Sequence, residues 1–241
     1  MTTDTVPKET VVRDFGFVVG GMAKGAGMVR PDMATMLAVL TTDAVVGAAD
    51  LQAALEAAVD ESFHALNIDG CPSTNDAVFA LASGASGVQP SQAELTEALG
   101  AACRDLATQL AADAEGSSRV VVIEVSGASD AATARRAGRH IADSGLVRAS
   151  FFGGDPNWGR VIGALGAGPV DFDPREVAVA YAGVTVAADG VAVPVDESAL
   201  LATLARGDFT VSVSIGDGPG SAAVLTTDLT PEYVRFNGER S

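Results

Sequence analysis

The chain has 241 residues, 48% of them hydrophobic, and its formal net charge is −16 because 31 Asp and Glu outnumber 15 Lys and Arg. This length and composition suffice for one large domain, or for a main domain with a smaller one. The acidic balance argues against nucleic acid and against an anionic membrane surface as partners.

Neither a membrane span nor a secretory signal is predicted, because no run approaches 18 apolar residues and no basic segment precedes an apolar core. The two cysteines, Cys71 and Cys103, lack CxxC spacing, and neither His64 nor His140 forms a local ligand cluster with them. We therefore predict no metal site, and reduced, buried thiols in a cytoplasmic protein.

The first predicted element is a hairpin over residues 11–22, and a loop over residues 24–31 follows it. Glycines free the loop backbone, and a proline ends it. The apolar run 36–40 then predicts a buried strand. Thr35 lies where loop and strand meet, eleven positions after Lys24, in a setting that suits an activated nucleophile. On composition alone, a β-former that starts a strand is the favoured interpretation of Thr35.

The next predicted helix covers residues 50–66, with Asp50 as N-cap and a structural His64 in its last turn. A polar loop, residues 69–76, leads into a strand over residues 77–82.

The longest predicted helix covers residues 91–114. Ser91 and Glu94 have capping-box spacing at its start, and Gly116 is the expected C-terminal stop.

The remaining elements alternate between strands and helices, which predicts a mixed α/β fold. Asp155 is the expected N-cap of one helix, and Asp189-Gly190 predicts a hairpin turn. Trp158 is either a scaffold anchor or part of a pocket. Predicted strands cover residues 120–125, 146–152, 209–215 and 222–226 and flank the turn within 177–193; predicted helices cover residues 130–144, 156–166 and 198–206.

Two motifs carry a family resemblance. Residues 24–44 read Lys-Gly-x-Gly-Met, then Pro-x-Met-Ala-Thr-Met-Leu-Ala-x-Leu-Thr-Thr-Asp-Ala, and residues 154–160 read Gly-Asp-Pro-Asn-Trp-Gly-Arg. Together they resemble the ornithine acetyltransferase family, the bifunctional glutamate N-acetyltransferases of arginine biosynthesis. The resemblance implies a layered αββα-like core with a smaller C-terminal lobe from about residue 170.

The resemblance also implies self-cleavage between Ala34 and Thr35. Residues 1–34 would then belong to the pre-cleavage chain and residues 35–241 to the post-cleavage chain. The Thr35 hydroxyl would attack the preceding carbonyl, the peptide would shift to an ester, and water would release the ester. The freed α-amine, of ordinary pKa about 8, would serve as base for its own hydroxyl.

The implied reaction is acetyl transfer from N2-acetylornithine to glutamate through an acetyl-Thr35 intermediate. No cofactor is needed, although acetyl-CoA is a second donor in some relatives. The resemblance implies an assembly of two cleaved chains as a hetero-tetramer. The substrate-binding residues that it implies are Thr2, Lys24, Thr35, Glu115, Asn237 and Ser241.

The sequence leaves two alternatives open: an aminopeptidase-like hydrolase of the same architecture, and a catalytically inert fragment. We expect the chain to lack most of the pre-cleavage half, because a Met-Thr-Thr-Asp-Thr-x-x-Lys segment is internal in the family. The family's oxyanion-hole Thr-Gly element lies in that half, and losing an oxyanion donor costs about 10²–10³ in rate.

Overall fold

The computed structural model describes residues 3–29, 36–72 and 75–239. The chain forms two compact units, Met1–Ala114 and Glu115–Ser241. We expect a C-terminal lobe from about residue 170, but that position lies inside the second unit. Both units combine helices with a sheet, so the predicted mixed α/β class is confirmed.

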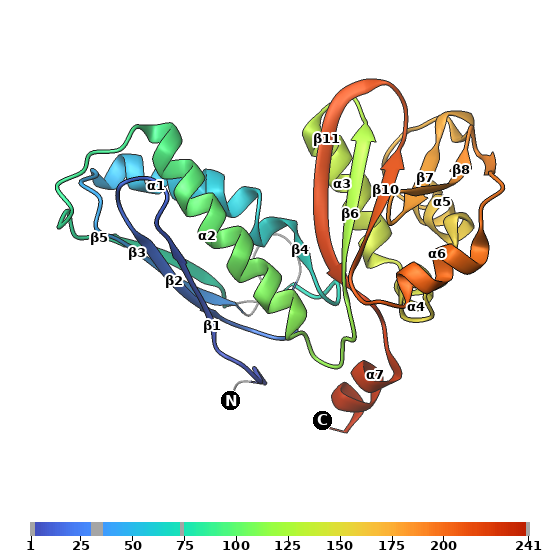
Figure 1. The fold of residues 1–241 in the computed structure, drawn as a ribbon, viewed down its shortest axis with the longest axis horizontal. Coiled ribbons are helices and arrows are strands. Elements are labelled where there is room, and N and C mark those ends of the chain that lie inside the picture. The colour runs from blue at the N-terminus through green and yellow to red at the C-terminus, as the bar shows by residue number, and fades with distance from the viewer. Residues whose placement is uncertain (1–2, 30–35, 73–74, 240–241) are drawn as a thin grey trace. The chain divides into compact units, whose positions relative to one another are not determined.

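The first unit is a four-stranded sheet in the order β1-β2-β3-β5, with two helices on one of its faces (Figure 1). β1 and β2 form the predicted antiparallel hairpin, β3 is antiparallel to β2, and β5 is parallel to β3. The elements are β1 (Lys8–Val12), β2 (Val19–Lys24), β3 (Leu37–Thr42), α1 (Ala48–Asp60), η1 (Phe63–Ala65), β4 (Leu66–Asn67), β5 (Ala77–Ala82) and α2 (Gln92–Ala112).

The core of this unit lies between α2 and the inner face of the sheet. Leu95, Leu99, Leu106 and Leu110 of α2 are buried. They recur at helical spacing and form one apolar stripe. The predicted capping box is present, with Ser91 and Glu94 bonding each other's backbone N–H groups. α2 is therefore fixed by local capping and by tertiary packing together.

The opposite face of this sheet is apolar and exposed. Alternate residues of a strand point to opposite faces, so the residues between the buried ones line this outer face. Five large hydrophobic side chains on it are between 44% and 61% exposed: Val11, Met22, Leu37, Phe79 and Leu81. Among the described residues, the helices of this unit cover the other face, so a layer on the outer face would complete an αββα arrangement.

The second unit is built on strands in the order β11-β6-β10-β7-β8-β9, in which β6 and β10 are parallel and the other pairs antiparallel. α3 packs against β6 and β11. The elements are β6 (Val120–Gly127), α3 (Ala131–Asp143), α4 (Gly145–Phe152), α5 (Trp158–Gly166), η2 (Pro174–Glu176), β7 (Ala178–Tyr181), β8 (Val184–Ala188), β9 (Val191–Ala192), α6 (Glu197–Leu204), β10 (Phe209–Ser214), β11 (Gly218–Thr227) and α7 (Pro231–Gly238).

The hairpin turn between β8 and β9 lies at Asp189-Gly190, as predicted. Asp189 and Gly190 both have positive φ, 52° and 70°. A type I′ two-residue turn requires positive φ at both central positions.

Three local predictions were wrong. Residues 146–152 belong to helix α4, capped by Ser144, and not to a strand. The N-cap of α5 is Asn157, whose side chain accepts from Arg160 N at 3.2 Å, and not Asp155. α1 begins after Gly47 and ends at Asp60, so His64 lies in the short helix η1 beyond it.

The cysteines differ in their surroundings. Cys103 is buried as predicted, and burial raises the pKa of its thiol to about 12. Cys71 is exposed, contrary to expectation, because it lies in the polar loop that precedes β5.

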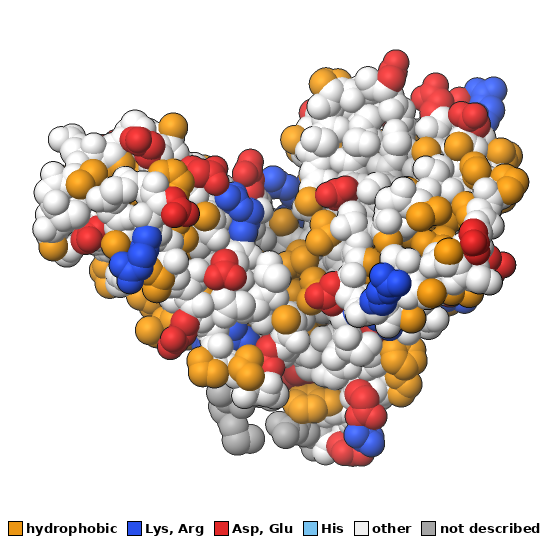
Figure 2. All heavy atoms as spheres, viewed as in Figure 1, with side chains coloured by type: hydrophobic (Ala, Val, Ile, Leu, Met, Phe, Trp, Pro, Cys, Tyr) orange, Lys and Arg blue, Asp and Glu red, His pale blue; other side chains and the backbone are white. Residues whose placement is uncertain are grey.

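On the face drawn in Figure 2, no single region gathers the acidic side chains. Figure 2 shows acidic side chains scattered over the visible face of each unit, with basic ones among them. None of the helices in the described part of the chain combines the length and the apolar character needed to cross a bilayer.

Candidate active site

The end of β2 and the starts of β3 and β5 lie side by side at one end of the first unit's sheet. Lys24 pairs with Leu37, and Leu37 pairs with Ala77. β2 runs antiparallel to β3, and β5 runs parallel to it. Lys24, Met36 and Asp76 therefore lie at the same end of the sheet, although up to 52 positions separate them along the chain.

Asp76 holds Met36, the residue that precedes β3. Its Oδ1 accepts the backbone N–H of Met36 at 2.7 Å. Its Oδ2 is buried and has no hydrogen-bond partner among the described residues. Burial raises the pKa of this carboxyl, while the Met36 N–H and the charge of Lys24 act in the opposite direction. This more basic carboxylate, better suited to accept a proton, therefore contacts the backbone of Met36, the residue that directly follows Thr35 in the chain.

The loop after β2 is fixed by two carboxylates. Asp69 accepts from Met28 N at 2.6 Å and from Val29 N at 3.1 Å, and Asp4 accepts from Gly25 N at 2.8 Å. Met28 has φ 57°, a conformation that few side chains adopt without such support. The described part of the loop is thus held at both of its ends.

A cavity of about 610 Å³ adjoins Asp76. Leu55 and Val59 of α1 and Val78 of β5 give it an apolar lining. His64 also lines it, with Nδ1 3.6 Å from the Asp60 carboxylate. Its volume lies within the range of small-molecule sites, about 300–1,000 Å³.

In the second unit, two predicted substrate-binding residues meet. Asn237 Nδ2 donates to Glu115 Oε2 at 3.3 Å and to the Tyr233 carbonyl at 3.1 Å. Asn237 lies in helix α7, which the sequence analysis did not predict, and a cavity of about 220 Å³ opens between Gly116 and α7. Glu115 and Asn237 are 122 positions apart in the chain, so the fold brings them together.

Thr230 joins the Glu115 segment to α7. Its hydroxyl donates to the Gly116 carbonyl and accepts from Tyr233 N at 3.0 Å, which caps the helix. Gly116 has φ 65°, and a Cβ there would lie 2.4 Å from Tyr233 N. Glycine is therefore required at this position because the backbone of α7 approaches so closely.

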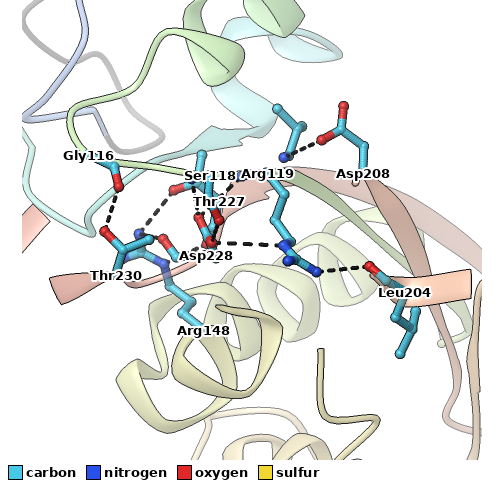
Figure 3. A network of polar contacts seen from close by, with 10 residues as sticks. Gly116, Ser118, Arg119, Arg148, Leu204, Asp208, Thr227, Asp228 and Thr230 are labelled. Carbon is cyan, nitrogen blue, oxygen red and sulfur yellow. Dashed lines mark hydrogen bonds and ion pairs between the residues drawn. The ribbon is translucent and has the colours of Figure 1, made fainter. Parts of the chain in front are cut away.

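A buried polar network supports this junction (Figure 3). Asp228 is 1% exposed and accepts from Ser118 N at 2.9 Å, from the Ser118 hydroxyl and from Arg119 N at 3.4 Å. The Arg148 side chain, also buried, donates to the carbonyls of Thr227 and Asp228 at 2.9 and 3.1 Å. The network ties the residues after Glu115 to those before α7.

The remaining predicted residues are placed as follows. Lys24 lies in the first unit and the Glu115–Asn237 pair in the second. Trp158 packs against the core of the second unit, which favours the scaffold interpretation. Asp4 and Asp69 were missed as supports of the site, because a carboxylate in a polar loop carries no periodic signal. Thr2, Ala34, Thr35 and Ser241 lie outside the described residues.

Comparison with known proteins gives one consistent result. The ArgJ family model matches residues 1–241. The chain is 50% identical over 242 residues to the arginine biosynthesis bifunctional protein ArgJ of Mycobacterium leprae, covering 100% of this chain and 59% of that protein. The protein of the same name from Thermobifida fusca is 46% identical over 240 residues, with 100% and 62% covered. The chain thus spans about three fifths of these relatives.

A solved structure agrees with the sequence comparison. It is the arginine biosynthesis bifunctional protein argJ of Bacillus halodurans, with a TM-score of 0.81 and 33% identity. The match covers 83% of this chain and 98% of that one.

Proposed function

Since the chain belongs to the ArgJ family, we propose that it is an acetyltransferase that moves acetyl from N2-acetylornithine to glutamate, after self-cleavage between Ala34 and Thr35. One observation carries the proposal. Met36, which directly follows Thr35 and precedes β3, is fixed by Asp76 at the end of the sheet where Lys24 ends β2. A nucleophile needs such a rigid support beside titratable groups.

The proposed reaction has two transfers. In the first, the Thr35 hydroxyl attacks the acetyl carbonyl of acetylornithine, the amide bond breaks, and the ornithine amine leaves with the hydroxyl proton. In the second, the glutamate amine attacks the acetyl-Thr35 ester, and the hydroxyl is regenerated. The Thr35 α-amine acts as the base in both, since its ordinary pKa of about 8 lies close to neutral pH.

The substrate is held by charge. Lys24 offers an ammonium to a substrate carboxylate. Glu115 offers a carboxylate to the α-amine of glutamate, because the α-nitrogen of N2-acetylornithine carries the acetyl group. The contact with Asn237 orients that carboxylate. Thr2 and Ser241 are proposed as further substrate contacts. The chemistry needs no cofactor, and acetyl-CoA is proposed as an alternative acetyl donor.

We further propose that the cleaved chains assemble as a hetero-tetramer in the cytoplasm. The exposed apolar face of the β1-β2-β3-β5 sheet supports an additional protein layer, since exposed patches of this kind mark interaction surfaces. Native mass spectrometry should give two copies each of two cleavage products. A monomeric, single-chain species would contradict this assembly.

Activity measurements separate the alternatives. Incubation with acetylornithine and glutamate should yield ornithine and acetylglutamate in equal amounts. Release of free acetate without acetylglutamate would favour the hydrolase, and the absence of both products would favour the inert chain.

Glu115→Gln should raise the KM for glutamate about 10- to 100-fold with a smaller effect on kcat, because a charge-assisted hydrogen bond contributes about 1.5–3 kcal/mol. Glu197→Gln, at an exposed position of α6, serves as control and should leave both constants unchanged. An unchanged KM in Glu115→Gln would remove Glu115 from the substrate site.

A further inference from the structure

A buried ion network lies in the first unit, apart from the residues assigned above to chemistry. Lys8 of β1 donates through Nζ to the carboxylates of Asp4 and Asp113. The three side chains are 1%, 11% and 7% exposed, respectively. An ammonium is rarely buried to this extent unless it is paired, so the two carboxylates explain how Lys8 is tolerated in β1.

The carboxylates are themselves well satisfied. Asp113 also accepts from the backbone N–H of Thr5 at 2.8 Å and from the Thr5 hydroxyl, and Asp4 also accepts from Gly25 N. Burial alone would raise the pKa of Asp113, but the hydrogen bonds from Lys8 and Thr5 outweigh it and hold the pKa below its ordinary value. Asp113 is therefore ionised at neutral pH, and the interaction with Lys8 is one between full charges.

The network joins three segments that each lead to a proposed substrate residue. Asp4 follows Thr2 by two positions, Gly25 directly follows Lys24, and Asp113 precedes Glu115 by two positions. Asp4 precedes β1, Gly25 follows β2, and Asp113 is the C-cap of α2. Lys8 contacts the carboxylates of two of these segments, and Asp4 in turn accepts a hydrogen bond from Gly25 N in the third.

We propose that Lys8, with Asp4 and Asp113, is a positioning device that sets the backbone around Lys24 and the start of the segment that carries Glu115. The proposal rests on the proposed function for the identity of the substrate residues. It assigns no contact with substrate to Lys8 itself.

Stability alone gives a weak reason for such a network. Replacing buried ion pairs by apolar side chains of similar volume is often neutral or stabilising. What an apolar cluster lacks is direction, because dispersion contacts tolerate small shifts that a charged hydrogen bond does not. Directional fixing of Gly25 N is therefore the property that a test should measure.

The test uses two variants and one control in the full chain. Asp113→Asn keeps the side-chain size but removes one charge. Lys8→Met/Asp113→Asn removes one charge of each sign and so keeps the network's net charge, which protects the fold if the single variant is unstable. Asp105→Asn, exposed on the same helix α2, is the matched control.

The first readout is hydrogen exchange of the peptide that contains Gly25, followed by mass spectrometry. We expect both network variants to exchange there about 10-fold faster than the parent and the control, while the amides of β3 are unchanged. The second readout is acetyl transfer. The KM for glutamate should rise about 10-fold and kcat should change less than about 3-fold, as expected when substrate residues are displaced and the nucleophile is not.

Three outcomes decide the matter. Parent-like exchange at Gly25 and a parent-like KM in both variants would overturn the proposal. So would faster exchange spread evenly over β1, β2, β3 and α2, since a purely structural role predicts loosening of the whole unit. If the parent chain shows no acetyl transfer while Gly25 exchange responds as expected, the function proposed above fails and the positioning of the Lys24 backbone by Lys8 stands.

Discussion

Thr35→Ala is expected to give a single uncleaved chain of 241 residues with no measurable acetyl transfer. The substitution removes the hydroxyl that would attack the Ala34 carbonyl and that would later carry the acetyl group. Without cleavage the α-amine at residue 35 is not released, so nucleophile and base are lost together. Removing a catalytic nucleophile of this kind costs about 10⁴–10⁶ in kcat, which places the variant below ordinary detection.

Intact-mass measurement and an acetyl-transfer assay check this result on one sample. The parent should give two products, one of which begins at Thr35. Thr41→Ala, at an exposed position of the neighbouring strand β3, is the control and should cleave as the parent does. If Thr35→Ala were cleaved or active, or the parent remained a single chain, the assigned nucleophile would be wrong.

Asp228→Ala is expected to destabilise the second unit by about 3–5 kcal/mol, the cost of leaving buried polar and charged partners uncompensated. Asp228 is 1% exposed and accepts from two backbone N–H groups and the Ser118 hydroxyl. The Arg119 Nε lies 3.9 Å from the Asp228 carboxylate and would lose this ion pair.

The fluorescence of Trp158 makes the unfolding measurement specific to the second unit. It is the one tryptophan of the sequence and packs in the second unit, so its fluorescence during urea unfolding reports that unit. Asp217→Ala, in the exposed turn before β11, should change the unfolding free energy by less than about 0.5 kcal/mol. If Asp228→Ala also changed the unfolding free energy by less than about 0.5 kcal/mol, the network in Figure 3 would contribute little to the unit's stability.

Local sequence signals predicted those elements whose formation depends mainly on neighbouring residues. The strand at residues 77–82 has the predicted bounds, because polar residues flank a short apolar run. The capping box of Ser91 and Glu94 starts α2 as expected, since its hydrogen bonds join residues three apart. The Asp189-Gly190 turn likewise depends on two adjacent conformations.

Residues 145–152 show where local signals fail. Their short apolar run suits a buried strand as well as a buried helix, and length alone does not separate the two. Arg148 lies in the middle of this segment, and its side chain reaches the carbonyls of Thr227 and Asp228, about 80 positions away. The Ser144 cap is a local signal for the helix. The prediction gave it less weight than the apolar run.

The sequence alone identified the family motifs, the chemistry that they imply and most of the helices and strands, because each depends on residue types within a short window. Tertiary structure decided the contacts of Glu115 with Asn237, of Asp69 with Met28 and of Lys8 with Asp113. Their partners are 41 to 122 positions apart. Such pairs form when packing brings distant segments together, and no periodicity in the chain records which carboxylate will meet which amide or ammonium.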